Sequence, residues 1–268
     1  MSLQQDIIND LKVQPTIDPA SEIRKRVDFL KGYIEKSGSQ GLLIAISGGI
    51  DSAVATGLCK QATDELTEST GREYKTVGVF QPYDTQSDIE DSYAVAQAFD
   101  LKYKVETNVH KAVDAIEQTV NSVMPQLEQD PLSPQAKGNV KARTRMVVQY
   151  AIANSLNLLV VGTDHASEAI TGFFTKYGDG AVDITPLSSL NKRQVRELAS
   201  HLSIPQSILD KAPSAGLWEN QTDENELGIT YADNSDYLEG KSIAPEAAER
   251  LETYYKRTAH KRDPIPGI

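Results

Sequence analysis

Three short apolar runs constrain the fold of this chain more than any other feature of its sequence. They lie at residues 42–46, 76–80 and 158–161, and a weaker run lies at 102–106. Continuous apolar runs of this length are typical of strands that are buried on both faces of a parallel sheet. We therefore expect these segments to be strands of one parallel sheet.

Segments with helical periodicity lie between and around these runs. The opening helix has one apolar face, formed by residues spaced four, three and four apart: Ile23, Val27, Leu30 and Ile34. Further helices are expected at residues 52–66, 87–99, 109–124 and 139–156, and beyond residue 185 at 191–202 and 244–259. This alternation predicts an α/β fold, namely an open, mostly parallel, twisted sheet flanked by helices, with a helical C-terminal part.

Two segments show no periodicity. Residues 125–138 contain Pro125, Pro131 and Pro134, and residues 211–225 read KAPSAGLWENQTDEN. Long irregular segments in a compact domain are usually functional loops or disordered ones. We therefore expect residues 1–268 to form a single domain with mobile loops near 125–138 and 211–225.

Charge and composition narrow the class of protein. The 268 residues carry a formal net charge of -11, which argues against a protein that grips nucleic acid through a basic face. The apolar runs are too short to span a bilayer, and the start of the chain does not resemble a secretory signal. A single cysteine, Cys59, excludes an internal disulfide. We expect a cytoplasmic protein that acts on small molecules, without nucleic-acid or membrane partners.

The first apolar run ends in Ser47-Gly48-Gly49, and a helix is expected to begin near Ser52. A helix N-terminus at the carboxyl end of a parallel strand offers free N–H groups and partial positive charge, and glycines allow close approach, so this loop suits an anion. An ordinary strand-to-helix turn is the alternative, with Asp51 as a first-turn acid that the helix dipole favours.

Asp51 places a negative charge inside this anion site. A carboxylate and a polyphosphate repel each other, but Mg²⁺ binds one or two carboxylates together with phosphate oxygens. Glu168 follows the run at 158–161 and would supply a second carboxylate if that strand lies beside the first. The loop therefore predicts a magnesium–nucleotide complex. His165, close to Glu168, is better explained as a helix cap or structural residue than as a ligand.

Ser47-Gly48-Gly49-Ile50-Asp51-Ser52 resembles the SGGxDS loop of the ATP pyrophosphatases, which have the adenine nucleotide α-hydrolase-like fold. Residues 158–187 more closely resemble the ammonia-dependent NAD⁺ synthetases. Further matching segments are GNVKARTRM (138–146), LNKRQVREL (190–198), KAPSAGLW (211–218), DYLEGK (236–241) and AHKR (259–262). The resemblance therefore extends along the whole chain.

This resemblance implies a set of site residues. The ATP-binding residues would be Ala45, Ile46, Ser47, Gly48, Gly49, Ile50, Asp51, Ser52, Thr163, Lys192 and Ser214. Asp51 and Glu168 would bind Mg²⁺. The residues that contact deamido-NAD⁺ (nicotinic acid adenine dinucleotide) would be Tyr33, Arg143, Lys176, Asp183, His260 and Lys261. Asp51, Lys176 and Lys192 would take part in catalysis. Structural alternatives remain for the charged residues: Arg143 on a solvated helix face, Lys192 in a first turn, and His260 and Lys261 at a helix C-terminus.

The resemblance also implies the reaction. ATP and Mg²⁺ would support amidation of deamido-NAD⁺ to NAD⁺ through an acyl-adenylate, with release of AMP and pyrophosphate, in a homodimer whose dinucleotide site lies near the interface. Ammonia is the expected nitrogen source, because Cys59 lies in an apolar helical setting and no chain length is left for a glutaminase domain. Two rival functions remain: another enzyme with the same loop, such as a tRNA modifier, and a non-catalytic nucleotide-binding module.

Overall fold

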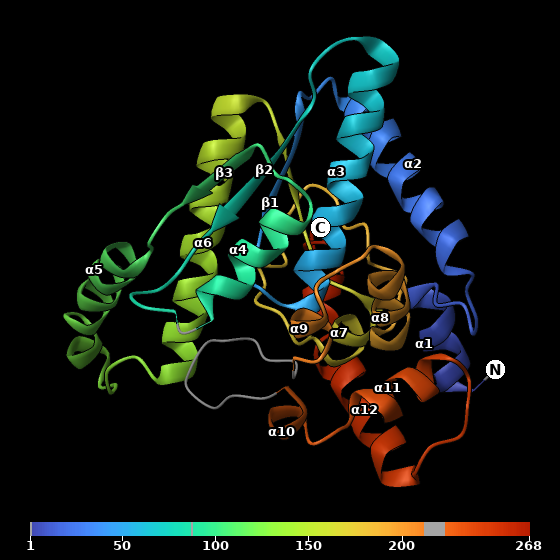
Figure 1. The fold of residues 1–268 in the computed structure, drawn as a ribbon. Coiled ribbons are helices and arrows are strands. Elements are labelled where there is room, and N and C mark those ends of the chain that lie inside the picture. Colours follow the sequence, from blue (N-terminus) through green and yellow to red (C-terminus); the bar gives the residue numbers. More distant parts are fainter. Residues whose placement is uncertain (1, 87, 212–222) are drawn as a thin grey trace.

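The computed structural model describes residues 2–86, 88–211 and 223–268. In that part of the chain, four strands form one sheet in the order β3-β2-β1-β4, and every neighbouring pair is parallel (Figure 1). The strands are β1 (Gly41–Ala45), β2 (Lys75–Phe80), β3 (Tyr103–Glu106) and β4 (Leu159–Val161). Each begins within one residue of the segment expected from the sequence. The predicted α/β class with a parallel sheet is therefore confirmed.

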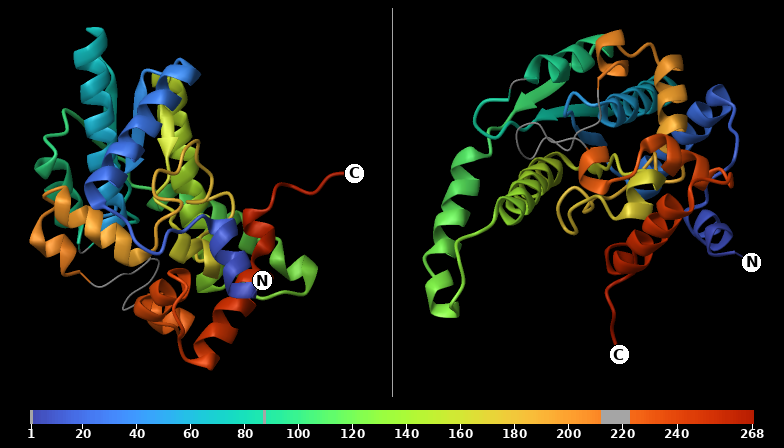
Figure 2. Two further views of the ribbon diagram at one scale, coloured as in Figure 1. Left: turned by 90° about the vertical axis from the view of Figure 1, so that its right-hand side faces the viewer. Right: turned by 90° about the horizontal axis from the view of Figure 1, so that it is seen from below.

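Helices cover both faces of the sheet (Figures 1 and 2). On one face lie α3 (Ile50–Thr70) and α4 (Ile89–Ala98), and α2 (Pro19–Ser37) and α8 (Lys192–His201) pack against α3. On the other face lies α6 (Pro134–Leu156), which α5 (His110–Asn121) contacts. Successive side chains of a strand point to opposite faces. Accordingly Leu42 and Ile44 belong to the core with α2, α3 and α8, and Leu43 belongs to a second core with Ala153 of α6.

A third apolar cluster joins the two ends of the chain. It contains Ile7 of α1 (Leu3–Leu11), Ile170 of α7 (Ala166–Thr171), Tyr237 of α11 (Tyr231–Leu238) and Leu251 of α12 (Pro245–Arg257). The remaining short helices are α9 (Gln206–Leu209), α10 (Asp223–Leu227) and α13 (Ala259–Arg262), together with the 3₁₀ turn η1 (Met124–Leu127). The predicted helical C-terminal part is confirmed. Helix α1 was not predicted, because its apolar residues are too few to show a clear period.

The segment expected to be irregular at 125–138 is shorter than predicted. Helix α6 begins at Pro134, and the Oγ of its N-cap residue Ser133 accepts a hydrogen bond from Ala136 N. The helix has no marked apolar face, so periodicity missed its first turn, although a serine followed by proline is a common helix start. Most of the other expected loop, residues 212–222, lies outside the described residues. The mobility of both segments stays a prediction.

Among the described helices, none is both long and apolar enough to cross a bilayer. Even α3, which has 21 residues, presents polar side chains on its outer surface, such as Lys60 and Asp64.

Leu58 lies on the buried face of α3 and is fully inaccessible to solvent. We expect Leu58→Ala to lower the free energy of unfolding by about 2–5 kcal/mol, because it removes apolar contacts and leaves a cavity. Urea unfolding measures the change. Leu156→Ala is the matched control, since Leu156 is 44% exposed at the end of α6. An equal loss in both variants would contradict the assignment of this core.

Candidate active site

The pairing of β1 with β4 determines where the site lies. Leu42 pairs with Leu159 and Ile44 with Val161, both in parallel register. The carboxyl ends of neighbouring parallel strands meet at one edge of the sheet, where α/β proteins bind their ligands. The loop after β1 and the segment from Gly162 to Glu168 therefore lie together, as the sequence predicted.

The loop after β1 leaves a helix N-terminus open. Helix α3 starts at Ile50, and its N-cap residue Gly49 provides no side-chain cap. The Ser52 hydroxyl ties the loop back, because it accepts from Ser47 N at 3.2 Å and donates to Gly49 O at 2.9 Å. The uncapped N–H groups of the first turn can receive an anion.

Gly48 has a physical reason to be glycine. Its φ is +76°, and a Cβ there would lie 2.8 Å from the Cβ of Asp91 on α4. Just before it, Ile46 N donates to Val79 O and so continues the strand ladder past Ala45. The loop at residues 46–49, here called the anion loop, is thus held between the sheet and α4.

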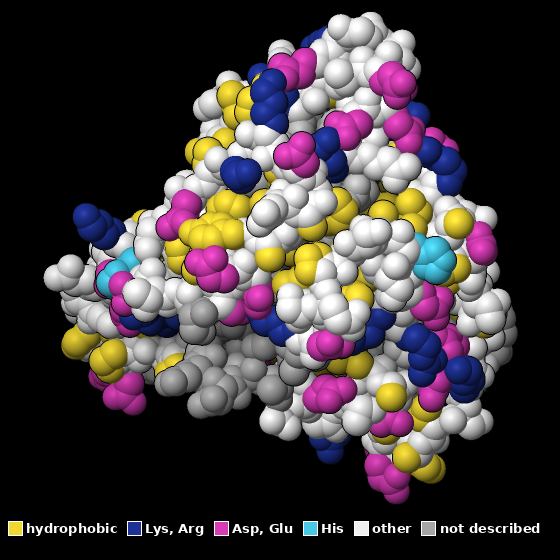
Figure 3. Space-filling view, in the orientation of Figure 1, with side chains coloured by type: hydrophobic (Ala, Val, Ile, Leu, Met, Phe, Trp, Pro, Cys, Tyr) yellow, Lys and Arg dark blue, Asp and Glu magenta, His cyan; other side chains and the backbone are white. Residues whose placement is uncertain are grey.

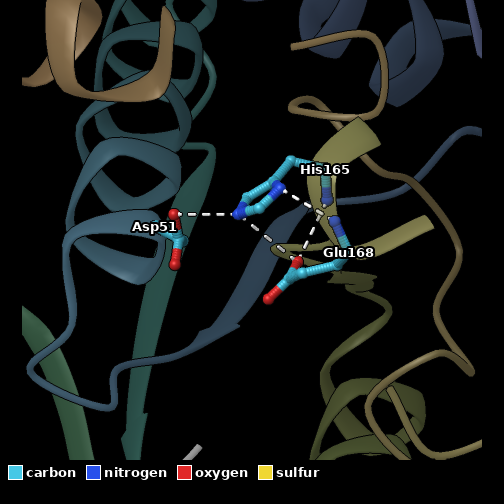
Figure 4. A group of neighbouring side chains, drawn as sticks. All are labelled: Asp51, His165 and Glu168. Carbon is cyan, nitrogen blue, oxygen red and sulfur yellow. Dashed lines mark hydrogen bonds and ion pairs between the residues drawn. The ribbon is translucent and has the colours of Figure 1, made fainter. Parts of the chain in front are cut away.

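Asp51, His165 and Glu168 converge beside this loop (Figure 4). One ligand atom from each lies within 4.8 Å of those of the other two. His165 is the N-cap of α7: its Nδ1 accepts from Glu168 N at 3.4 Å, and Glu168 Oε2 accepts from His165 N at 3.2 Å. The capping role favoured from the sequence for His165 is confirmed.

The cap also determines the tautomer of His165. Because Nδ1 accepts a hydrogen bond, the proton of the neutral ring resides on Nε2. Nε2 lies 3.4 Å from Asp51 Oδ1 and 3.6 Å from Glu168 Oε2, so the N–H faces both carboxylates. A protonated nitrogen cannot bind a metal, which leaves Asp51 and Glu168 as the candidate ligands.

These two carboxylates fit a divalent cation such as Mg²⁺. Asp51 Oδ1 is buried, and it has no well-formed hydrogen bond with any described residue, because its 3.4 Å contact with His165 Nε2 lacks hydrogen-bond geometry. Buried polar atoms without hydrogen bonds are costly and rare. Oxygen ligands from one or two carboxylates, completed by phosphate and water, are what Mg²⁺ prefers.

Asp51 and Glu168 have different pKa values, because Lys192 lies beside Asp51 whereas burial dominates at Glu168. Burial alone would raise the pKa of Asp51, but Lys192 Nζ at 2.6 Å and His165 outweigh it and hold that pKa well below its usual value. Burial raises the pKa of Glu168 to about 8, and the charge of Asp51 adds to this effect while His165 opposes it. Without a cation, Glu168 therefore keeps its proton at neutral pH.

A second group of predicted residues gathers around the loop that follows α7. The Arg143 guanidinium donates to Lys176 O at 3.2 and 3.3 Å, and Lys176 Nζ donates to His260 O. Lys261 Nζ donates to Gly172 O and to Phe174 O, each at 2.7 Å. Four of the residues assigned to deamido-NAD⁺ are thus brought together from α6, α13 and this loop.

The other predicted residues are placed differently. Asp183 holds the start of β4, because its Oδ2 accepts from Val160 N at 2.7 Å and its Oδ1 accepts from Tyr150 OH at 3.1 Å. Thr163 is half-buried after β4. Tyr33 lies on α2 with 37% of its surface exposed. Ser214 lies outside the described residues.

Two residues near the site were missed. Asp164 lies between the two groups: burial, and then the charges of Asp179 and Asp51, raise its pKa well above the usual range. Its position between Thr163 and His165 was the available signal. Tyr231 has its ring centroid 5.1 Å from Lys192 Nζ. Burial, followed by the charge of Glu168, raises its pKa far above the usual value and keeps the phenol neutral. No spacing in the sequence connects Tyr231 with the site.

The raised pKa of Glu168 predicts a pH dependence in the metal-free protein. Its pKa is about 8 in the folded protein, against about 4.5 for a solvated glutamate side chain in the unfolded chain. The folded state therefore binds the Glu168 proton more tightly than the unfolded chain does. Its contribution to the free energy of unfolding is complete below pH 4.5 and is lost as the pH rises to 8. Relative to Glu168→Gln, the wild type should lose about 1 kcal/mol or more between pH 5 and 8. Urea unfolding in EDTA measures this difference. A difference that does not change with pH would contradict the assignment.

Comparisons with known proteins identify the family of this chain. The model of the family described as NAD synthase matches residues 22–265. A protein of Limosilactobacillus fermentum named NH(3)-dependent NAD(+) synthetase is 46% identical over 265 residues, which are 97% of this chain and 94% of the relative. A Mycobacteroides abscessus protein of the same name is also 46% identical, over 97% and 95% of the two chains.

Two solved structures are similar as well. The NAD⁺ synthetase of Burkholderia pseudomallei is 34% identical with a TM-score of 0.82, over 97% of this chain and 95% of that one. The NMN synthetase of Francisella tularensis is 36% identical with a TM-score of 0.83, over 94% and 99%. The resemblance found in the sequence is confirmed, and the chain belongs to the NAD synthase family.

Proposed function

We propose that this protein is a ligase that converts deamido-NAD⁺ to NAD⁺ with ATP and ammonia, releasing AMP and pyrophosphate. One observation carries the proposal: Asp51, Glu168 and the Lys192 ammonium converge at the uncapped N-terminus of α3. This arrangement suits a nucleotide polyphosphate and its cation. The names of the relatives at 46% identity support the choice of substrates.

The chemistry proceeds in two steps. The nicotinate carboxylate attacks the α-phosphorus of ATP, a P–O bond forms, and pyrophosphate leaves as the bond to the β-phosphate breaks. Ammonia then attacks the carbonyl carbon of the acyl-adenylate, a C–N bond forms, AMP leaves, and the nitrogen loses a proton. Activation is needed because a free carboxylate has no adequate leaving group.

Asp51, Glu168, Lys192 and the loop before α3 would bind and neutralise the triphosphate. N–H groups of the first turn of α3, with the hydroxyl of Ser47, would hold phosphate oxygens, and Ser52 would hold the loop in shape through its bonds to Ser47 N and Gly49 O. Mg²⁺ on Asp51 and Glu168 would neutralise phosphate charge. Lys192 would stabilise the charge that develops on the leaving pyrophosphate. Ala45, Ile46, Gly48, Gly49, Ile50, Thr163 and Ser214 would complete the ATP site.

The residues of the second group would orient the dinucleotide. The cations Arg143, Lys176 and Lys261, with His260, match the pyrophosphate and carboxylate charges of deamido-NAD⁺. Lys176 would act in catalysis by orienting this substrate. We include Asp183 and Tyr33 in the dinucleotide site on the family resemblance.

Free ammonia is the proposed nitrogen donor. Cys59 is fully buried in α3, and burial raises the pKa of its thiol well above the usual value. Such a thiol is inert and cannot serve as the nucleophile that glutamine hydrolysis needs.

A second candidate is amidation of the corresponding mononucleotide. The Francisella tularensis structure, 36% identical, bears the name NMN synthetase. Both candidates share the adenylation site and differ in what the Arg143 group must hold.

We also propose that residues 1–268 act as a single domain, in the cytoplasm, and as a homodimer. Four apolar side chains in or beside α5, η1 and α6 are exposed: Ile116, Val123, Leu127 and Val147. Helix α5 stands away from the sheet (Figures 1 and 2), and we propose that these side chains contact a second copy. Val147 lies one turn after Arg143 on α6, which would put the interface beside the dinucleotide site.

Small molecules rather than nucleic acids are the proposed partners. On the face drawn in Figure 3, Lys and Arg side chains are dispersed among Asp and Glu. A polyanion-binding surface would instead group its basic residues.

Product analysis tests the function. The protein is incubated with ATP, Mg²⁺, ammonium and either the dinucleotide or the mononucleotide acid, and products are identified by mass spectrometry. NAD⁺, AMP and pyrophosphate in equal amounts are expected. Amidation of the mononucleotide alone would establish the second candidate, and the absence of pyrophosphate with both substrates would exclude adenylation altogether.

Asp51→Asn should lower turnover by about 100-fold or more, because a neutral amide is a poor Mg²⁺ ligand and loses the ion pair with Lys192. The measurement is the initial rate of pyrophosphate release at saturating ATP. Circular dichroism verifies that the fold is retained. Turnover within a few-fold of wild type would remove the proposed metal role of Asp51.

Val147→Glu should shift the protein from dimer to monomer, because it buries a charge in the proposed apolar interface. Light scattering after size-exclusion chromatography measures the mass. Leu156→Glu, at the C-terminal end of α6, is the control. A monomeric wild type, or a dimeric Val147→Glu variant, would argue against this interface.

A further inference from the structure

Tyr231 is held rigidly beside Lys192. It is the first residue of α11, whose N-cap Thr230 accepts a hydrogen bond from Asp233 N. Its backbone N donates to Glu224 Oε1 at 2.7 Å, and its hydroxyl donates to Asp223 Oδ2 at 2.8 Å. With both ends fixed, the ring is presented to Lys192 Nζ at 5.1 Å from the ring centroid.

Lys192 needs more than one partner at this position. Its side chain is only 3% exposed, and its Nζ donates to Asp51 Oδ2 at 2.6 Å. Asp51 is also a candidate metal ligand, so a bound cation would compete with Lys192 for the same carboxylate. An aromatic face attracts an ammonium group independently of Asp51, and most strongly where water is excluded.

The backbones of the two residues are also fixed relative to each other. Ser167 on α7 is the shared point: its Oγ accepts from Lys192 N at 3.1 Å, and its carbonyl accepts from Asn234 Nδ2 of α11 at 3.2 Å. Ser167 directly precedes Glu168. Helices α7, α8 and α11 thus keep the Tyr231 ring, the Lys192 ammonium and the Glu168 carboxylate in one arrangement.

We propose that Tyr231 is a positioning residue for the adenylation step. Its ring retains the Lys192 ammonium in the site when Asp51 engages the metal, so that Lys192 meets the charge that develops on pyrophosphate. This inference rests on the proposed function. It predicts that loss of the ring slows adenylation and leaves the later attack of ammonia unchanged.

Two substitutions separate the ring from the hydroxyl. Tyr231→Phe and Tyr231→Leu both remove the hydrogen bond to Asp223, so both should lower the melting temperature, but only the first keeps an aromatic face. The measurement is the rate of the pyrophosphate burst in single turnovers without ammonium, at saturating Mg²⁺-ATP and deamido-NAD⁺. This rate should fall by no more than about threefold in Tyr231→Phe and by about tenfold or more in Tyr231→Leu. Equal slowing in the two variants would overturn the proposal.

A double-mutant cycle tests whether the ring acts through Lys192. In a Lys192→Ala background, Tyr231→Leu should cause no further slowing of the burst. An undiminished effect there would show that Tyr231 acts in another way.

A spectroscopic measurement is independent of turnover. In protein labelled with ¹³C-lysine, the ε-methylene signal that disappears in Lys192→Ala should be shifted upfield by the Tyr231 ring and should stay shifted on addition of Mg²⁺ and ATP. Loss of the shift on loading would contradict the proposal. A wild type with no pyrophosphate burst would refute the proposed function, whereas this signal would still decide whether the ring positions Lys192.

Discussion

The parallel pairing of β1 with β4 is the constraint on which the rest of the site depends. It places the carboxyl ends of two strands that are more than a hundred residues apart in the sequence side by side. The anion loop follows one strand and the His165 cap follows the other. Because each loop leads directly into a helix, α3 and α7 bring Asp51 and Glu168 together beside the loop after β1 (Figure 4).

The electrostatic surroundings then give Asp51 and Glu168 different protonation states. Asp51 shares its carboxylate with Lys192 and stays ionised, whereas burial raises the pKa of Glu168 to about 8. The backbone contact of His165 Nδ1 turns the Nε2 proton toward both acids and so removes the imidazole as a ligand. The helix cap thereby leaves only carboxylate oxygens as candidate ligands, which are the donor type that Mg²⁺ prefers.

The strands and the positions of the two acids could be predicted, because they depend on residues that are close together in the sequence. The strands of the sheet begin within one residue of the expected segments, since buried parallel strands are short continuous apolar runs. Asp51 and Glu168 were assigned correctly to one place, because each closely follows such a strand. The start of α6 was placed five residues too late, since that helix lacks an apolar face and its Ser133-Pro134 signal was not weighed. Asp164 was missed although it lies between two residues that were singled out, Thr163 and His165. Tyr231 was missed because its contact with Lys192 exists only after α8 and α11 have packed.

The sequence by itself determined the class of fold, the anion loop, the acids beside it and the family, because these depend on neighbouring residues and on strand order. Only the tertiary structure decided the tautomer of His165, the ion pair of Lys192 with Asp51 and the aromatic contact of Tyr231. Those contacts join residues up to 141 positions apart, and their geometry is set by how helices pack on the sheet, which no local pattern encodes.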